Sequence, residues 1–207
     1  MRARAIHRYV ASATVDGREE AFADVVGALV TMRASFVTFV DDRASMDRAL
    51  ETTARAAART GRAADATALH GDLAPHARER ALNDWNARRY VEDGDVGVLV
   101  TTDACAPRRA RGERAARVKA LVHYDSPRDA STYRARLTSA FADDALDAMA
   151  NEVGADADGS HRVVISLIVG PAEATRFVDV SKELNLDASD LSLDVLRPLN
   201  PAIECKV

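Results

Sequence analysis

The 207-residue sequence has two cysteines, few lysines and no long apolar run. Cys105 and Cys205 have no neighbours at metal-ligand spacing, so we expect a reduced compartment and no zinc or other metal site. No apolar run approaches the roughly 20 residues of a membrane span, and no signal-like apolar block follows the first residues. The sequence therefore predicts an intracellular protein, cytoplasmic or nuclear, with no membrane partner.

Lysine supplies only three of the 28 basic residues, and the formal net charge is −4. This balance argues against a protein that binds polyanions over its whole surface. The basic residues instead crowd one stretch, which contains Arg108, Arg109, Arg111, Arg114, Arg117 and Lys119. Such a cluster suits phosphate binding, and a solvated charged insertion is the alternative.

Short apolar segments that are typical of buried strands recur along the chain. They are Ile6–Ala11, Phe36–Val40, Ala66–Leu69, Val96–Val100, Ala120–His123 and Val163–Val169. Segments with apolar residues at helical spacing alternate with them, so we expect an α/β fold: a mostly parallel sheet of about six strands with helices on both faces. We expect one domain over residues 1–187 and a tail over residues 188–207.

Two further segments carry specific expectations. The stretch Ala142–Ser160 is acidic and weakly patterned, so we expect a surface loop. Gly170 and Pro171 are expected to start a helix. The residues expected on its buried face are Ala174, Phe177, Val178 and Ser181.

The unit from Asp95 to Pro127 contains two of the apolar segments, each ending in polar residues. Val98–Val100 ends in Thr101-Thr102-Asp103, and Ala120–Val122 ends in His123-Tyr124-Asp125. In an open parallel sheet, ligands bind outside the carboxyl ends of the strands. We therefore expect the working edge of the sheet at these strand ends.

Four motifs in order resemble those of the C-terminal RecA-like domain of DEAD-box RNA helicases, most closely the translation initiation factor four A type. Ser35–Arg43 resembles motif IV, Leu69–Leu73 the His-Gly-Asp-Met element, Val98–Asp103 the start of motif V, and Leu121–Pro127 the V-I-N-Y-D-L-P strand. The resemblance covers Ile6–Leu184 and implies a RecA-like fold.

The resemblance implies a binding surface for the backbone of single-stranded RNA. The matching residues are Gly71, Asp72, Arg78, Thr101 and Thr102. Hydroxyls, strand-end amides and a guanidinium can hold phosphates without reading bases. The alternative is that Gly71-Asp72 is only a turn and Thr101-Thr102 only a strand end.

The nucleotide-facing motifs depart from the family pattern. The best match to the continuation of motif V puts Arg111 and Gly112 at nucleotide-binding positions, but Arg114 stands where the family has an aspartate that holds the ribose. In motif VI only Arg136 is retained, because Ser139 and Ala142 replace the two arginines that reach the transferring phosphate. Arginine fingers accelerate phosphoryl transfer roughly a thousandfold or more.

The sequence also contains neither a G-x-x-x-x-G-K-[ST] motif nor a D-E-A-D-type acidic run. We therefore expect a degenerate helicase domain, a pseudoenzyme with no catalytic residue and no cofactor of its own. ATP and magnesium would be used only together with an N-terminal RecA-like domain. One alternative is the functional half of an ATP-dependent RNA helicase that works with such a domain.

Two readings without RNA stay open. The first is a protein-interaction module that docks an initiation-scaffold protein, as this helicase type does. The second is a small-molecule α/β enzyme with His70 or His123 as the base, although no nucleophile accompanies either histidine.

Overall fold

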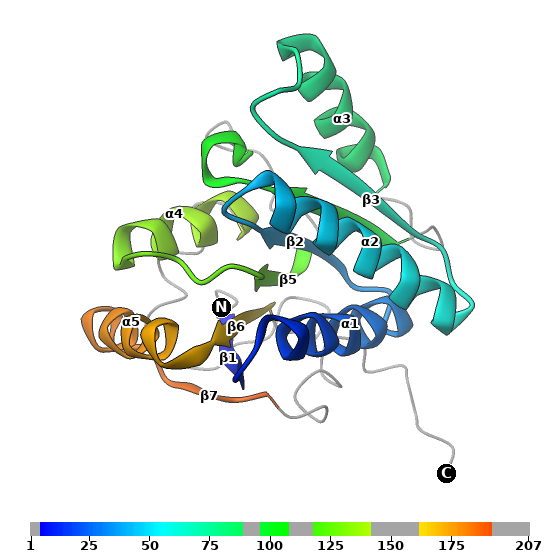
Figure 1. Ribbon diagram of the computed structural model, residues 1–207. Coiled ribbons are helices and arrows are strands. Elements are labelled where there is room, and N and C mark those ends of the chain that lie inside the picture. The colour runs from blue at the N-terminus through cyan, green and yellow to red at the C-terminus, as the bar shows by residue number, and fades with distance from the viewer. Residues whose placement is uncertain (1–4, 89–95, 108–117, 142–161, 192–207) are drawn as a thin grey trace, which may run out of the picture.

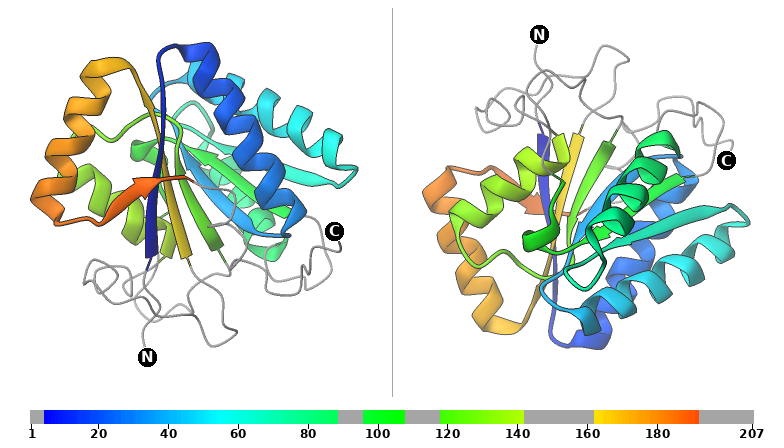
Figure 2. Two further views of the ribbon diagram at one scale, coloured as in Figure 1. Left: turned by 90° about the horizontal axis from the view of Figure 1, so that it is seen from below. Right: turned by 90° about the horizontal axis from the view of Figure 1, so that it is seen from above.

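The computed structural model describes residues 5–88, 96–107, 118–141 and 162–191. Within them, seven strands form one sheet in the order β3-β4-β2-β5-β6-β1-β7, with every neighbouring pair parallel (Figures 1 and 2). The strands are β1 (Ala5–Ser12), β2 (Ser35–Phe39), β3 (Ala64–Leu69), β4 (Val96–Thr101), β5 (Val118–His123), β6 (Arg162–Val169) and β7 (Ala188–Asp190). The expected parallel α/β sheet is confirmed.

Helices cover both faces of the sheet. They are α1 (Val15–Thr31), α2 (Arg43–Thr60), α3 (Pro75–Arg88), α4 (Ala130–Phe141) and α5 (Gly170–Leu184), with a 3-10 turn, η1 (Asp103–Cys105). Helices α1 and α2 share one core with the sheet, whereas α3, α4 and α5 pack in a second core on the opposite face (Figure 2). The central strands are buried on both faces, which explains their continuous apolar sequences.

Side-chain caps fix where the helices begin and end. The Asp42 carboxylate accepts a hydrogen bond from the Ser45 amide at 2.7 Å and starts α2, and Gly61 ends this helix with φ +68°. Asp129 accepts a hydrogen bond from the Thr132 amide at 2.7 Å at the start of α4. This bond and the Ser131 hydroxyl lower the pKa of Asp129 to about 2.

Strand β7 corrects the expected tail, because residues 188–190 belong to the sheet. His7 to Tyr9 of β1 pair with Ala188–Asp190, and the Leu191 amide donates to the Tyr9 carbonyl at 2.9 Å. Such an edge strand is held by its backbone and is not buried on both faces, so its sequence carries no apolar signal. The sheet therefore has seven strands among the described residues, one more than expected.

Helix α5 buries part of the expected face, since Ala174 packs against the core beside Phe177 but Val178 does not. Phe177, Val180 and Leu184 are buried, whereas Val178 is 46% exposed. Val178 follows Phe177 directly and so points about 100° away around the helix, off the face that meets the sheet. The acidic stretch 142–160 and most of the tail lie outside the described residues. Among the helices that the structure describes, none is long and apolar enough to span a membrane.

Candidate functional site

Polar residues follow β3, β4, β2 and β5, which are consecutive in the sheet, so these residues gather along one carboxyl edge. The register between β3 and β4 pairs Leu69 with Thr101. The turn at His70-Gly71-Asp72 therefore starts beside Thr102. The edge brings together residues that are more than 30 positions apart in the sequence.

His70 links the end of β3 to the start of α2. The Arg43 guanidinium lies 2.5 Å from His70 Nε2 and also donates through Nε to Asp47 Oδ1 at 3.0 Å. Arginine can only donate, so Nε2 must accept and the ring proton must sit on Nδ1. Nδ1 lies 3.5 Å from the carboxylate of Asp72, which is 85% exposed. His70 therefore contacts both Arg43 and the exposed turn.

Of the two threonines, only Thr102 is accessible. Thr101 is fully buried, and its hydroxyl donates to the Leu69 carbonyl at 3.3 Å, so it ties β4 to β3. Thr102 is half-buried, and its side chain makes no capping bond to η1. The structure therefore corrects the expected pair, because the Thr101 hydroxyl is enclosed by the protein.

Arg78 reaches from α3 toward the loop that follows β4. Its Nη1 lies 3.9 Å from the Cys105 sulfur, at the end of η1. Gly71 and Asp72 are exposed and Arg78 is half-buried. Four of the five residues expected at the RNA surface, Gly71, Asp72, Arg78 and Thr102, thus remain accessible along the ends of β3 and β4.

Arg136, on α4, is only 1% exposed, and its guanidinium is held by protein acceptors. Nε donates to Asp103 Oδ1 at 2.6 Å and Nη2 donates to Asp103 Oδ2 at 2.8 Å. Nη1 donates to the Asp125 carbonyl at 2.7 Å, and Nη2 also donates to Asp41 Oδ1 at 3.0 Å. Four of its roughly five N–H groups are thereby used.

These contacts do not fit a nucleotide-binding role for Arg136. A phosphate could bind the guanidinium only after the paired Asp103 carboxylate was displaced, which would leave Asp103 without its partner. Ser139, one turn further along α4, donates its hydroxyl to the Pro107 carbonyl at 3.0 Å and is buried. Arg111, Gly112 and Ala142 lie outside the described residues.

Asp41 gives this edge an exposed carboxylate. Burial of part of the group and the negative charge of Asp125 raise the pKa of Asp41, whereas the Arg136 guanidinium opposes the rise. The Asp41 side chain is 59% exposed, so it also adds negative charge to the surface beside Arg43. A carboxylate here weakens the attraction for phosphate.

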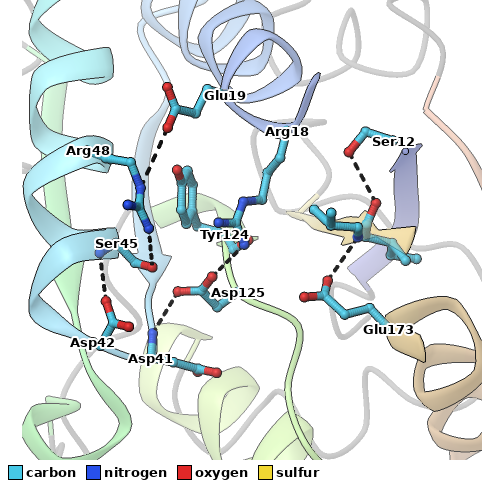
Figure 3. A network of polar contacts seen from close by, with 12 residues as sticks. Ser12, Arg18, Glu19, Asp41, Asp42, Ser45, Arg48, Tyr124, Asp125 and Glu173 are labelled. Atoms are coloured by element: carbon cyan, nitrogen blue, oxygen red, sulfur yellow. Dashed lines mark hydrogen bonds and ion pairs between the residues drawn. The ribbon is translucent and has the colours of Figure 1, made fainter. Parts of the chain in front are cut away.

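A second arginine fixes the adjoining strand ends (Figure 3). Arg18, on α1, donates to Asp125 Oδ1 at 2.6 Å, and its guanidinium lies 4.4 Å from the centre of the Tyr124 ring. The other oxygen of Asp125 accepts from the Asp41 amide at 2.8 Å. Asp125 thus joins the end of β5 to the β2–α2 turn, and its role is structural.

The buried histidines do not form an enzyme active site. His123 lies 3.1 Å from the Ser166 hydroxyl, and His7 lies 2.7 Å from the Tyr133 hydroxyl. Burial lowers the pKa of His7 to about 4 and that of His123 well below its usual range, and it raises the pKa of Tyr133. His123 is fully buried, so it cannot reach a substrate as a base.

The sequence reasoning missed the roles of Arg43, Asp103 and Asp125. Asp103 and Asp125 stand two residues after the ends of β4 and β5, Arg43 follows the Asp42 helix cap, and each lies in a motif that was identified. Polar residues at adjacent strand ends were the available signal. Their partners could not be derived, because those partners come from α1, α4 and the turns after β2 and β3.

Comparisons with known proteins agree on the fold. No family model matches the chain. A 66-residue stretch, 32% of this chain, is 38% identical to DEAD-box ATP-dependent RNA helicase 3B, chloroplastic, of Zea mays, and spans 8% of that protein.

Two solved structures cover nearly all of the chain. Dbp5 of S. cerevisiae, bound to RNA and ADP BeF3, has a TM-score of 0.66 at 16% identity and covers 97% of this chain and 46% of its own. The E. coli DEAD-box protein SrmB, bound to regulator of ribonuclease activity A, has a TM-score of 0.61 at 19% identity, covering 95% of this chain and 96% of its own. At these identities the likeness shows the fold, which is that of the RecA-like domains of DEAD-box proteins.

Proposed function

We propose that this chain is a RecA-like helicase domain of the C-terminal type that binds the sugar–phosphate backbone of single-stranded RNA along the ends of β3 and β4. We propose also that it hydrolyses no ATP by itself. The observation that carries the proposal is the position of Arg78 against η1. It places a guanidinium against the loop that follows Thr102, and the register of β3 and β4 puts the start of the exposed turn that contains Gly71 and Asp72 at the neighbouring strand end.

The chemistry of this edge suits backbone recognition. A guanidinium binds phosphate oxygens, a hydroxyl and turn amides donate to the same oxygens, and none of these groups reads a base edge. The Asp72 carboxylate can accept a hydrogen bond from a ribose 2′-hydroxyl, which DNA lacks. The surface should therefore bind RNA with little sequence preference.

The absence of ATPase activity is supported by the contacts of Arg136. The residue that would face a nucleotide is paired with Asp103 and Asp41, and Ser139 stands where the resemblance expects an arginine. These 207 residues also carry no phosphate-binding G-x-x-x-x-G-K-[ST] motif. ATP and magnesium would require an N-terminal RecA-like domain to bind them.

A titration of fluorescein-labelled oligouridine tests the RNA surface. Binding should weaken about tenfold between about 50 and 200 mM salt, because each phosphate contact releases counterions. Arg78→Ala should weaken binding by about tenfold, the effect of losing one charge-assisted hydrogen bond. Arg80→Ala is the matched control, since Arg80 is exposed on another side of the same helix.

Two outcomes would contradict the RNA surface. One is equal binding by Arg78→Ala and Arg80→Ala. The other is no binding at the lower salt concentration, which would favour the reading as a scaffold-docking module.

A second candidate is the functional half of a two-domain RNA helicase, favoured by the chain's coverage of 46% of Dbp5. An RNA-stimulated ATPase assay separates the two. We expect turnover at background for the chain alone and after addition of an N-terminal RecA-like domain of a DEAD-box protein. RNA-dependent turnover in the mixture would establish the second candidate.

A further inference from the structure

The surface of α1 carries an apolar groove away from the proposed RNA edge. The groove encloses about 690 Å³ and is lined by α1, by Val10 of β1, by Leu191 and by the C-terminal end of α2. We call it the α1 groove. Strand β1 lies next to the edge strand β7, whereas β3 forms the opposite edge of the sheet (Figure 1). An occupant of the groove therefore leaves the ends of β3 and β4 free.

The floor of the α1 groove is made largely of small side chains. Ala21, Ala28 and Met32 are partly exposed and pack against the core beneath α1. Gly27 leaves further space, because a Cβ there would meet no atom of the described chain within 4 Å. From Ala21 to Met32 the floor extends for roughly 16 Å along α1, the rise of eleven helical residues. A row of side chains at helical spacing, with short members, is a surface on which a second helix can pack closely.

A row of carboxylates borders this floor. Asp16, Glu20 and Asp24 are exposed and lie four residues apart on α1, so they share one line along the helix. Ala21 and Val25 directly follow two of them, so the apolar row lies about 100° away around the helix. None of the described residues forms an ion pair with these three carboxylates. We call them the carboxylate row, and their like charges repel one another at this spacing.

A charged depression of about 520 Å³ adjoins the groove and contains the whole carboxylate row. The lining of the depression also includes Glu19, Arg55 and Arg59. Glu19 forms an ion pair with Arg48 at 3.5 Å, and Arg55 forms one with Glu51 at 3.6 Å. The lining that is left consists of the three carboxylates of the row against the single charge of Arg59. The border of the groove is therefore negative.

Apolar floor and negative border together define the chemistry of the occupant. The carboxylate row repels the phosphates of nucleic acids and of anionic lipids, so neither RNA nor a membrane surface fits this face. A protein segment that places apolar side chains on the floor and lysine or arginine beside the row satisfies both features.

We propose that the α1 groove docks an amphipathic helix of a partner protein. The apolar face of that helix packs on Ala21, Ala28 and Met32, and its basic residues lie against Glu20 and Asp24. This docking goes beyond the proposed RNA binding and does not depend on it, because the two surfaces involve opposite edges of the sheet. Partner and RNA can therefore be bound at the same time.

Fluorescence anisotropy with a synthetic probe tests the proposal on the full chain. The probe is a fluorescein-labelled, alanine-rich peptide of about 16 residues, long enough to form a helix, with leucines at helical spacing and lysines in the adjacent row. A second peptide of the same design carries glutamate in place of each lysine. The lysine peptide should bind about tenfold or more tightly than the glutamate peptide, because its charges attract the carboxylate row.

A variant that fills the groove separates this site from the rest of the surface. Gly27→Gln introduces a side chain into open space without changing the charge, and it keeps α1 helical. It should weaken binding of the lysine peptide about tenfold. Ala54→Gln is the matched control, because Ala54 is exposed on α2 and lines neither the groove nor the depression.

A charge variant gives an independent readout. Glu20→Gln combined with Asp24→Asn removes two charges of the carboxylate row and should also weaken binding of the lysine peptide about tenfold. Asp179→Asn combined with Glu183→Gln removes the same two charges at the same spacing from α5, on the other face of the sheet. This control should bind the peptide as the unchanged chain does.

NMR spectra locate the bound probe. The methyl signals of Ala21, Ala28 and Met32 should shift when the lysine peptide is added, and those of α5 should not. The proposal is overturned by equal binding of the two peptides, by equal binding to Gly27→Gln and Ala54→Gln, or by no binding at all. Groove signals that shift with protein concentration in the absence of peptide would also overturn it, since a second copy of the chain would then occupy the groove.

Discussion

The guanidinium of Arg136 donates two hydrogen bonds to the carboxylate of Asp103, from Nε to Oδ1 at 2.6 Å and from Nη2 to Oδ2 at 2.8 Å. This pair ties α4 to the loop after β4, and a third bond ties α4 to the Asp125 carbonyl after β5. Arg136, which the resemblance assigns to nucleotide binding, therefore links α4 to the loops that follow β4 and β5.

Removing the Arg136 guanidinium should destabilise the domain. Arg136→Ala leaves the Asp125 carbonyl unsatisfied and opens space in the core, so urea unfolding should show a loss of about 2–4 kcal/mol. Arg136→Lys keeps the charge but loses the two parallel hydrogen bonds to Asp103, so its free energy of unfolding should lie between those of the unchanged chain and Arg136→Ala. Arg134→Ala, an exposed change on the same helix, should stay within about 0.5 kcal/mol of the unchanged chain. Equal stability of Arg136→Ala and Arg134→Ala would contradict this role.

Asp41→Asn should strengthen RNA binding. The change removes a negative charge that is 59% exposed at the proposed edge, while the amide oxygen can still accept from Arg136. A charge interaction of about 1 kcal/mol at the surface corresponds to about fivefold in affinity. The oligouridine titration measures this, with Asp179→Asn on α5 as the control. Weaker binding by Asp41→Asn would show that the carboxylate is a favourable contact.

Stability should fall as the pH is lowered from about 6.5 toward 4. The folded state keeps His7 and His123 neutral, because burial lowers both pKa values, whereas the unfolded chain takes up protons at the ordinary histidine pKa of 6.5. Below that pH the unfolded state binds more protons, and each histidine lowers the free energy of unfolding by about 1.4 kcal/mol per pH unit. The contribution of His7 levels off near its folded pKa of about 4.

Urea unfolding at several pH values measures this slope. His7→Asn should reduce the slope of the free energy of unfolding against pH by the contribution of one histidine, whatever the effect of the change on stability at pH 7. Asn83→Ala should leave the slope unchanged, because Asn83 is uncharged and exposed on α3. Identical slopes in the unchanged chain and in His7→Asn would contradict a neutral buried His7.

The same glycine-to-alanine change should raise the stability of the protein at one position and lower it at another. Gly27 lies inside α1, and a Cβ there would meet no atom of the described chain within 4 Å, so Gly27→Ala should stabilise the protein by about 0.5–1 kcal/mol. Gly61 also has open space but has φ +68°, so Gly61→Ala should destabilise by about 1 kcal/mol. Thermal unfolding of both variants measures this. A shift of the same sign in both would contradict the helix boundaries.

Much of the fold could be predicted from the sequence, because its central strands are buried on both faces and read as continuous apolar runs. Strand β7 could not, since Ala188–Asp190 is a short edge strand that pairs through its backbone with β1 and carries no apolar run. At the site, the polar strand ends predicted the edge. The resemblance predicted five RNA-contacting residues, of which four are accessible, and their contact with RNA stays a prediction. The burial of Thr101 and the capture of Arg136 by Asp103 depend on packing between distant elements, which no local pattern encodes.

An NMR titration of the chain with oligouridine tests the central claim most directly. The amide signals of Gly71, Asp72, Arg78 and Thr102 should shift at low salt and return when salt is raised, with α5 and β7 unaffected. Shifts confined to α5, β7 or α1, or no shifts at all at low salt, would contradict an RNA-binding edge at the ends of β3 and β4.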